Sequence, residues 1–230
     1  MARTASRSFG AAERDAPRGQ AELQPRARAT RSAILTAAAE HFARDGYHAT
    51  SLDRVLADSG GTKGALYFHF ASKQALARAV ITEMVKQWGN LRVEIGERGL
   101  DPLSALLALV DEVIARLVDN PIARGGTRLL SEAPKRPPEA GEHCSFGECD
   151  ALALLTEAAR SGLLRDEVDP AVVARQVVAL VAGHRQICDV LDERRDLWRR
   201  IDEAWSLLLP TIATEAWLAG RCASQRAARP

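Results

Sequence analysis

Residues 50–70 read TSLDRVLADSGGTKGALYFHF, and the interpretation of the whole chain starts from this stretch. In its first half, Leu52, Val55 and Leu56 recur at the spacing that places them on one face of a short helix. The two glycines that follow Ser59 end this helix, because glycine tolerates the left-handed conformation found just past a helix.

The second half of the stretch predicts another short helix, over residues 63–70. Leu66 and Phe70 share the face that can pack back on the first helix. Thr62 can cap this helix with its side-chain oxygen. Two short helices joined by a glycine-containing turn are typical of the helix-turn-helix, although a purely structural helical hairpin has the same pattern.

The other face of the second helix carries side chains that suit contact with DNA. Lys63 places a positive charge near a helix N-terminus, where backbone N–H groups also attract phosphate oxygens. Gly64 and Ala65 are small enough for the helix to enter a major groove about 12 Å wide. Thr50 or Ser51 can also cap the first helix. The predicted DNA-binding residues are Thr50, Ser51, Thr62, Lys63, Gly64, Ala65, Tyr67, His69 and Lys73.

Two runs carry a resemblance to a known family. TKGALYFHFASKQAL (62–76) and TRSAILTAAAEHFARDGYHATSLDRVL (30–56) resemble the N-terminal domain of TetR-type repressors, and most closely the γ-butyrolactone autoregulator receptors of streptomycete-like bacteria. The chain departs from the family at Gly61, where the family usually has an apolar residue, often Val. We expect this change to remove a packing contact inside the turn, and so to loosen or re-aim the recognition helix.

The resemblance implies a ligand-responsive repressor. Such a protein binds a palindromic operator as a homodimer, is released by a small, largely apolar signalling molecule, and controls secondary metabolism such as antibiotic biosynthesis. That molecule would be γ-butyrolactone-like or an antibiotic or other biosynthetic product. A DNA-binding regulator or activator that senses no ligand is the alternative.

Composition indicates an all-α fold, because Ala and Leu are abundant, aromatics make up 5%, and no sustained period-2 alternation occurs. We expect a basic arm without periodicity (1–22), which either touches DNA or is a solvated tail, and a three-helix helix-turn-helix domain (23–72). A larger helical ligand-binding and dimerisation domain (73–220) and a short tail (221–230) follow. The net charge of +1 divides into +4 for residues 1–73 and −3 for the remainder, which suits one DNA-facing end.

The chain shows no apolar run near 20 residues and no secretory h-region, so we expect a cytoplasmic, nucleoid-associated protein with no membrane partner. Within the larger domain, helices are predicted at about 73–96, 102–119, 149–161, 170–190 and 197–217, the last kinked at Pro210. Apolar positions at 172–190 cover more than one face, so this helix must be buried on two sides. The TetR-like solution is a four-helix bundle made by two subunits, and one bulky monomeric core is the alternative.

The helices over 103–183 either form a solid core or enclose a cavity for a small apolar ligand, and the resemblance favours the cavity. The lactone receptors typically carry a Trp where this chain has Cys149, which suggests a different or larger ligand. The predicted lining residues are Met84, Trp88, Val110, Phe146, Cys149, Val177 and Leu180.

No other chemistry is indicated. Cys144 beside His143, with Cys149 nearby, lacks the second ligand pair of a zinc site, so ordinary thiols are the simpler interpretation. The sequence contains no G-x-S-x-G, H-E-x-x-H or C-x-x-C motif. We therefore expect no enzyme activity, no metal and no cofactor.

Overall fold

The computed structural model describes residues 18–132, 147–191 and 194–227. Within these ranges the chain forms ten α-helices and a short 3-10 turn, and so has the all-α fold that the sequence predicts. The helices are α1 (Arg18–Ala49), α2 (Leu52–Ser59), α3 (Lys63–His69), α4 (Lys73–Glu97), α5 (Pro102–Asp119), α6 (Pro121–Glu132), α7 (Glu148–Arg160), α8 (Pro170–Leu191), α9 (Leu197–Ile212) and α10 (Glu215–Ala227), and the 3-10 turn is Arg194–Asp196.

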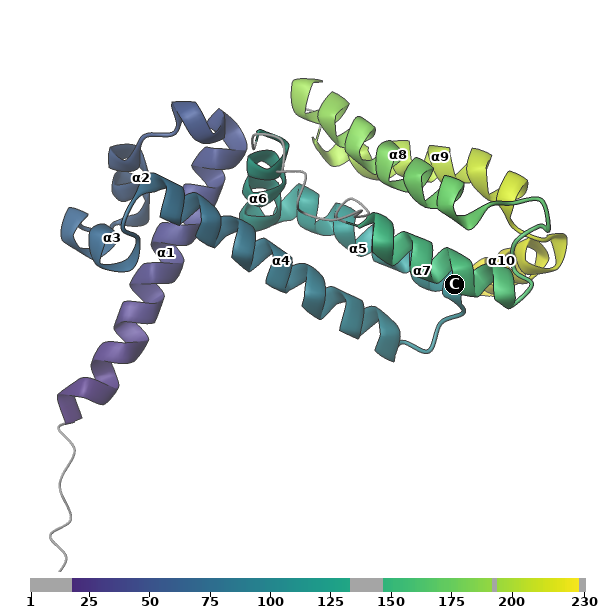
Figure 1. The fold of residues 1–230 in the computed structure, drawn as a ribbon, viewed down its shortest axis with the longest axis horizontal. Coiled ribbons are helices and arrows are strands. Elements are labelled where there is room, and N and C mark those ends of the chain that lie inside the picture. The colour runs from purple at the N-terminus through teal and green to yellow at the C-terminus, as the bar shows by residue number, and fades with distance from the viewer. Residues whose placement is uncertain (1–17, 133–146, 192–193, 228–230) are drawn as a thin grey trace, which may run out of the picture.

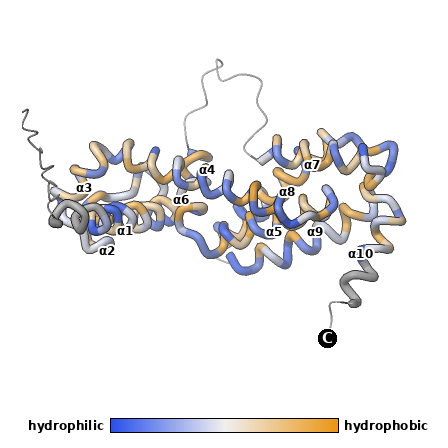
Figure 2. The backbone as a smooth tube through the Cα atoms, turned by 90° about the horizontal axis from the view of Figure 1, so that it is seen from below, coloured by the Kyte–Doolittle hydropathy of each residue, from blue (hydrophilic) through white to orange (hydrophobic). Residues whose placement is uncertain are grey.

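The helices are arranged in two groups (Figure 1). Helices α1–α3 form a small unit at one end, and α4 runs from this unit along the length of the molecule. Helices α5 and α7–α10 pack together at the other end, with α6 between the two groups. Hydrophobic and hydrophilic residues alternate along most helices (Figure 2), as expected where one face of each helix is buried.

Several helix starts follow from the local sequence. Thr62 accepts a hydrogen bond from the backbone N–H of Ala65, and Ser72 accepts one from Ala75, each at 3.1 Å. Asp101 caps α5 in the same way ahead of Pro102. These caps confirm the starts predicted for three helices, because a cap depends on residues that are adjacent in the chain.

Helix α1 begins before residue 23, where the helix-turn-helix domain was predicted to start. It begins at Arg18, where the sequence had indicated the basic arm, and residues 1–17 of that arm lie outside the described residues. Helical geometry is interrupted at Gly46 (φ 77°, ψ 178°), a positive-φ conformation that glycine tolerates, and a last turn continues to Ala49.

Two larger cores organise the described residues. The first joins α1–α3 to α4 and α6, and includes Phe42, Val55, Leu66 and Met84. The second lies among α5 and α7–α9. Because the first core runs on into α4 and α6, these two helices are packed directly against the helix-turn-helix.

The C-terminal helix differs from the prediction. Pro210 lies within the last turn of α9 and does not divide the helix there. The direction changes at Ala213, which is extended and forms a bridge with Leu164, and α10 then begins at Glu215. The bridge holds the chain at Ala213, so the break falls three residues later than the proline. No helix in the described ranges is both long enough and apolar enough to cross a membrane.

Candidate DNA-binding surface and ligand cavity

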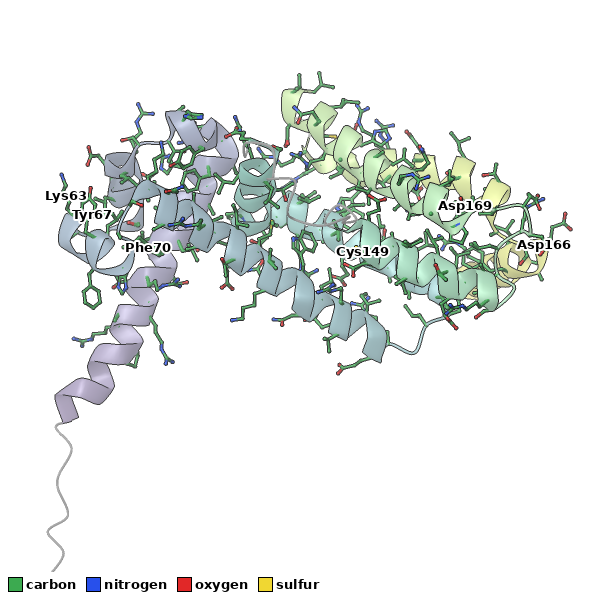
Figure 3. All side chains as sticks on the ribbon, in the orientation of Figure 1. Lys63, Tyr67, Phe70, Cys149, Asp166 and Asp169 are labelled. Carbon is green, nitrogen blue, oxygen red and sulfur yellow. The ribbon has the colours of Figure 1, made fainter. Side chains whose placement is uncertain are left out.

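Helix α3 presents one face to the core and the other to solvent. Leu66 and Phe70 are 1% and 3% exposed and pack with Val55 of α2, as predicted. Lys63 and Tyr67 lie at the outer edge of the molecule and point away from its body (Figure 3), and Tyr67 is 50% exposed. An exposed cation and an exposed phenol on one short helix suit contact with a charged backbone.

The other predicted contacts vary in accessibility. Thr62 and Gly64 are exposed, whereas Ser51, Ala65 and His69 are half-buried. The Lys73 ammonium donates a hydrogen bond to the His48 carbonyl at 3.1 Å and lies 4.9 Å from the centre of the Tyr47 ring. Lys73 therefore has a structural role within the domain.

Thr50 requires a correction. It is 4% exposed, and its hydroxyl donates a 2.6 Å hydrogen bond to the carbonyl of Gly46. Ser51 occupies the N-cap position of α2, and its side chain makes no capping hydrogen bond. Thr50 thus closes the end of α1 and neither caps α2 nor reaches DNA, a role that depends on the unusual conformation of Gly46.

The space beside Gly61 is already filled. A β-carbon there would lie 3.3 Å from Cγ1 of the buried Ile34 and 3.1 Å from Oγ of Ser59. A side chain at position 61 would therefore press closely on Ile34 of α1, and the expected loosening or re-aiming of the recognition helix stays a prediction.

Phe68 was missed by the sequence argument. It is 80% exposed, although it lies between the buried Leu66 and Phe70. The signal was present, since a residue two positions from each of two buried residues in a helix points away from the core. The predicted contacts are polar or small side chains, and this choice left out a large apolar one.

A polar cluster around the buried His41 joins α2 to α1. His41 is 2% exposed, and its Nε2 lies 2.7 Å from a carboxylate oxygen of Asp58 in α2. Arg44 donates to Nδ1 of His41 at 2.7 Å and to both oxygens of Asp45. The Arg44 hydrogen bond lowers the pKa of Asp45 from its usual 3.8 to about 2. This network holds the first helix of the helix-turn-helix in a fixed position.

A cavity of about 440 Å³ lies among α4–α8, within the range of volumes that hold small ligands. Met84, Trp88, Val110 and Val177 line it, as predicted by position. Most of the other lining side chains are also apolar, including Leu106, Leu109, Val113, Leu117, Leu130, Val178 and Val181. Arg92 and Asp150, which form a 2.9 Å ion pair, and Arg185, paired with Asp189 at 2.7 Å, supply the charged groups.

Two predicted lining residues lie elsewhere, and a third is not described. Cys149 on α7 is exposed (Figure 3), and its neighbours Asp150 and Ala151 line the cavity instead. Leu180 lies in a separate groove between α8 and α9. The rotation of each helix about its axis decides which residues face the cavity, and tertiary packing sets that rotation. Phe146, His143 and Cys144 fall outside the described residues, and the remainder contains no cluster of three potential metal ligands.

Helix α6 is in close contact with two helices that hold the helix-turn-helix. A β-carbon on Gly125 would lie 2.5 Å from the carbonyl oxygen of Ala39 in α1, and one on Gly126 would lie 2.6 Å from the sulfur of Met84 in α4. Thr127, the next residue, lines the cavity. Three consecutive residues of α6 therefore contact α1, α4 and the cavity.

The end of α6 is also joined to the end of α1 by polar contacts. Arg128 donates to the carbonyls of Ala43 and Arg44, at 3.0 and 2.9 Å. Glu132 accepts the backbone N–H of Tyr47 at 2.7 Å and the side-chain N–H of Arg128 at 2.9 Å. Burial works against ionisation of Glu132, but these two hydrogen bonds leave its pKa below the usual value.

Comparison with known proteins agrees with this architecture. Residues 34–80 match the family described as "Bacterial regulatory proteins, tetR family", and residues 101–213 match "Tetracyclin repressor-like, C-terminal domain". The chain belongs to the TetR family of transcriptional regulators, and is close to the γ-butyrolactone receptors within it.

Individual relatives point the same way. The A-factor receptor protein of Streptomyces griseus is 35% identical over 191 residues, which are 83% of this chain and 66% of the receptor. The solved structure of CprB, a TetR family protein from S. coelicolor A3(2), is 33% identical with a TM-score of 0.74, over 83% of this chain and 92% of that one. A γ-butyrolactone receptor described as an ArpA-like protein is 31% identical with a TM-score of 0.69, over 83% and 91% of the two chains.

Proposed function

We propose that the chain is a ligand-responsive repressor. Two copies bind a palindromic operator through α3, and a small, largely apolar molecule in the cavity releases them. The observation that carries this proposal is that two of the helices that line the cavity, α4 and α6, also pack against the helix-turn-helix unit. Met84 of α4 and Thr127 of α6 line the cavity, and α6 is packed and hydrogen-bonded to α1.

The repressor leaves the operator if the ligand binds more tightly to a conformation in which α4 and α6 are displaced. A ligand shifts an equilibrium between two conformations only by the difference in its affinity for them. A molecule that pushes on Met84 or Thr127 displaces helices with little free space around them, since Gly125 and Gly126 already lie at contact distance from α1 and α4. The α3 helices of the two subunits would then change their separation and fit the operator less well.

Two copies are needed because one α3 reads too few base pairs. Single base contacts contribute about 1–3 kcal/mol each, whereas specific binding requires roughly 4–10 kcal/mol beyond non-specific binding. A structure of CprB with its operator sequence, 34% identical with a TM-score of 0.71, supports the same mode of binding for this chain.

The lining supports a largely apolar ligand that carries at least one polar group. We infer that this molecule is γ-butyrolactone-like or a product of the biosynthetic genes under control, and that the protein regulates secondary metabolism. The volume of about 440 Å³ accommodates either.

The experiment that tests this function is retardation of DNA from the promoter region of the protein's own gene. We expect a specific complex that unlabelled promoter DNA competes away, and that a synthetic γ-butyrolactone or an extract of the producing culture dissociates. A specific complex that resists every such addition would favour the alternative, a regulator that senses no ligand. Absence of any specific complex would contradict the proposal.

A further inference from the structure

The most exposed large hydrophobic side chain in the described part of the molecule is Phe68, at 80%. It lies on α3, the helix on which the proposed function depends. Phe68 is two residues from Leu66 and two from Phe70, and both of these are buried. Because a helix turns by about 100° per residue, the side chain of Phe68 points away from the core. Single exposed apolar side chains are common on protein surfaces, but this ring lies on the face of α3 that the proposed function directs toward DNA.

The surroundings of Phe68 leave its ring accessible. Gly64 lies one turn earlier on the same side of α3, and a β-carbon there would meet nothing closer than Thr62 Oγ1 at 4.0 Å. Side chains on a helix lean toward its N-terminus, so the ring of Phe68 leans over the position that Gly64 leaves open. The ring of His69 stands edge-on to it, with centroids 5.0 Å apart.

The chemistry of α3 favours DNA as this partner. Lys63 and Tyr67 are exposed on the same short helix, and α3 carries no carboxylate. A phenyl ring has no hydrogen-bond donor, so it makes no directed contact with phosphate oxygens or with the acceptors of the bases. The apolar group that a base edge presents in the major groove is the C5-methyl of thymine.

We propose that Phe68 is a specificity-determining residue that reads the C5-methyl group of a thymine in each half of the operator. This inference rests on the proposed function, because it requires α3 to lie in the major groove. It predicts that the preferred operator has a fixed thymine where Phe68 approaches, and that cytosine, which lacks the methyl group, is rejected there.

The test uses a duplex selected by the full-length protein from a random-sequence library. Each thymine of the selected duplex is replaced in turn by deoxyuridine, which removes only the methyl group. For the unchanged protein, we expect the replacement to matter at one thymine in each half-site. Each such replacement should lower the affinity about fourfold, because one methyl-sized group is no longer buried. For Phe68→Ala the same replacement should have no further effect.

A matched control separates this contact from general effects. Val93, which is 61% exposed on α4, is also a large exposed apolar residue, and Val93→Ala should keep the full response to deoxyuridine. Affinity for random DNA at low salt gives the non-specific binding of each variant, against which its response to deoxyuridine is compared.

The possible failures are distinguishable. If the unchanged protein selects no sequence, the proposed function itself is wrong. If it selects a duplex but deoxyuridine has no effect at any thymine, or has an equal effect on Phe68→Ala, the function stands and the inference about Phe68 is overturned.

Discussion

Thr50 shows how a buried hydroxyl can stabilise the helix-turn-helix without touching DNA. Its 2.6 Å hydrogen bond to the carbonyl of Gly46 ties the irregular end of α1 to the start of α2. Thr50→Val leaves that carbonyl without its donor, and should lower the free energy of unfolding by about 1–3 kcal/mol. Thr50→Ser keeps the hydroxyl and should lower the free energy of unfolding by a smaller amount.

Urea unfolding measures both variants. Operator affinity, corrected for the folded fraction, should be unchanged in each. An equal loss of stability in Thr50→Val and Thr50→Ser would show that the hydrogen bond is not the cause.

Asp45 predicts a pH dependence. Hydrogen bonding from Arg44 lowers the pKa of Asp45 in the folded protein to about 2, from 3.8. A carboxyl group whose pKa is lowered on folding contributes stability above its unfolded pKa, and this contribution is lost as the pH falls toward the folded value. The unchanged protein should therefore exceed Asp45→Asn in thermal stability near neutral pH, and the difference should narrow as the pH falls from about 4 toward 2. A difference independent of pH would contradict this role for Asp45.

At the scale of elements, α6 connects the cavity to the DNA-binding unit through close contacts. Gly125→Ala would place a β-carbon 2.5 Å from the backbone of Ala39, which is a rigid neighbour. We expect overpacking to cost about 1–3 kcal/mol of stability, measured by urea unfolding.

Gly96 supplies the control for this change. It lies in α4 with no atom within 4 Å of an added β-carbon, so Gly96→Ala should raise stability by up to about 1 kcal/mol. If Gly125→Ala were as stable as Gly96→Ala, α6 and α1 would not be in the tight contact described above.

The elements also show what the sequence determines. The starts of α3, α4 and α5 were predictable because Thr62, Ser72 and Asp101 act on residues two or three positions away. The break at Ala213 was not, because it depends on pairing with Leu164, about fifty residues distant in the chain.

The candidate sites divide in the same way. Lys63 and Tyr67 were predictable as contacts because they are the charged and phenolic side chains of the predicted recognition helix, and both are exposed. Helical spacing around Leu66 and Phe70 directs Phe68 away from the core. The exclusion of Cys149 and Leu180 from the cavity follows from how α7 and α8 are rotated against their neighbours. Helical spacing within one segment does not predict this rotation, because contacts between distant segments determine the rotation.

At the scale of the whole molecule, the proposed homodimer predicts the effect of a surface charge. Large apolar side chains remain exposed on α8 and α9, and they include Val190 (73%) and Leu207 (77%). We expect these helices to pair with the same helices of a second copy, and Leu207→Glu to convert the dimer to a monomer because a carboxylate would be buried in the interface. Analytical ultracentrifugation measures the change.

The control for the dimer places the same charge on another surface. Val93 is 61% exposed on α4, outside the proposed interface, and Val93→Glu should remain dimeric. If both variants sedimented as the unchanged protein does, the second copy would bind through some other surface.

The central claim is that α3 binds duplex DNA through the face that bears Lys63. The most direct test measures affinity for the selected operator and for random DNA at several salt concentrations, for the unchanged protein and for Lys63→Ala, with Lys86→Ala on α4 as the control. Lys63→Ala removes one phosphate contact per subunit, so the affinity for both DNAs should fall by the same factor. The slope of log affinity against log salt concentration should become shallower by about two for the dimer, whereas Lys86→Ala should change neither the affinity nor the slope. Lys63→Ala binding with unchanged affinity and slope would contradict the claim.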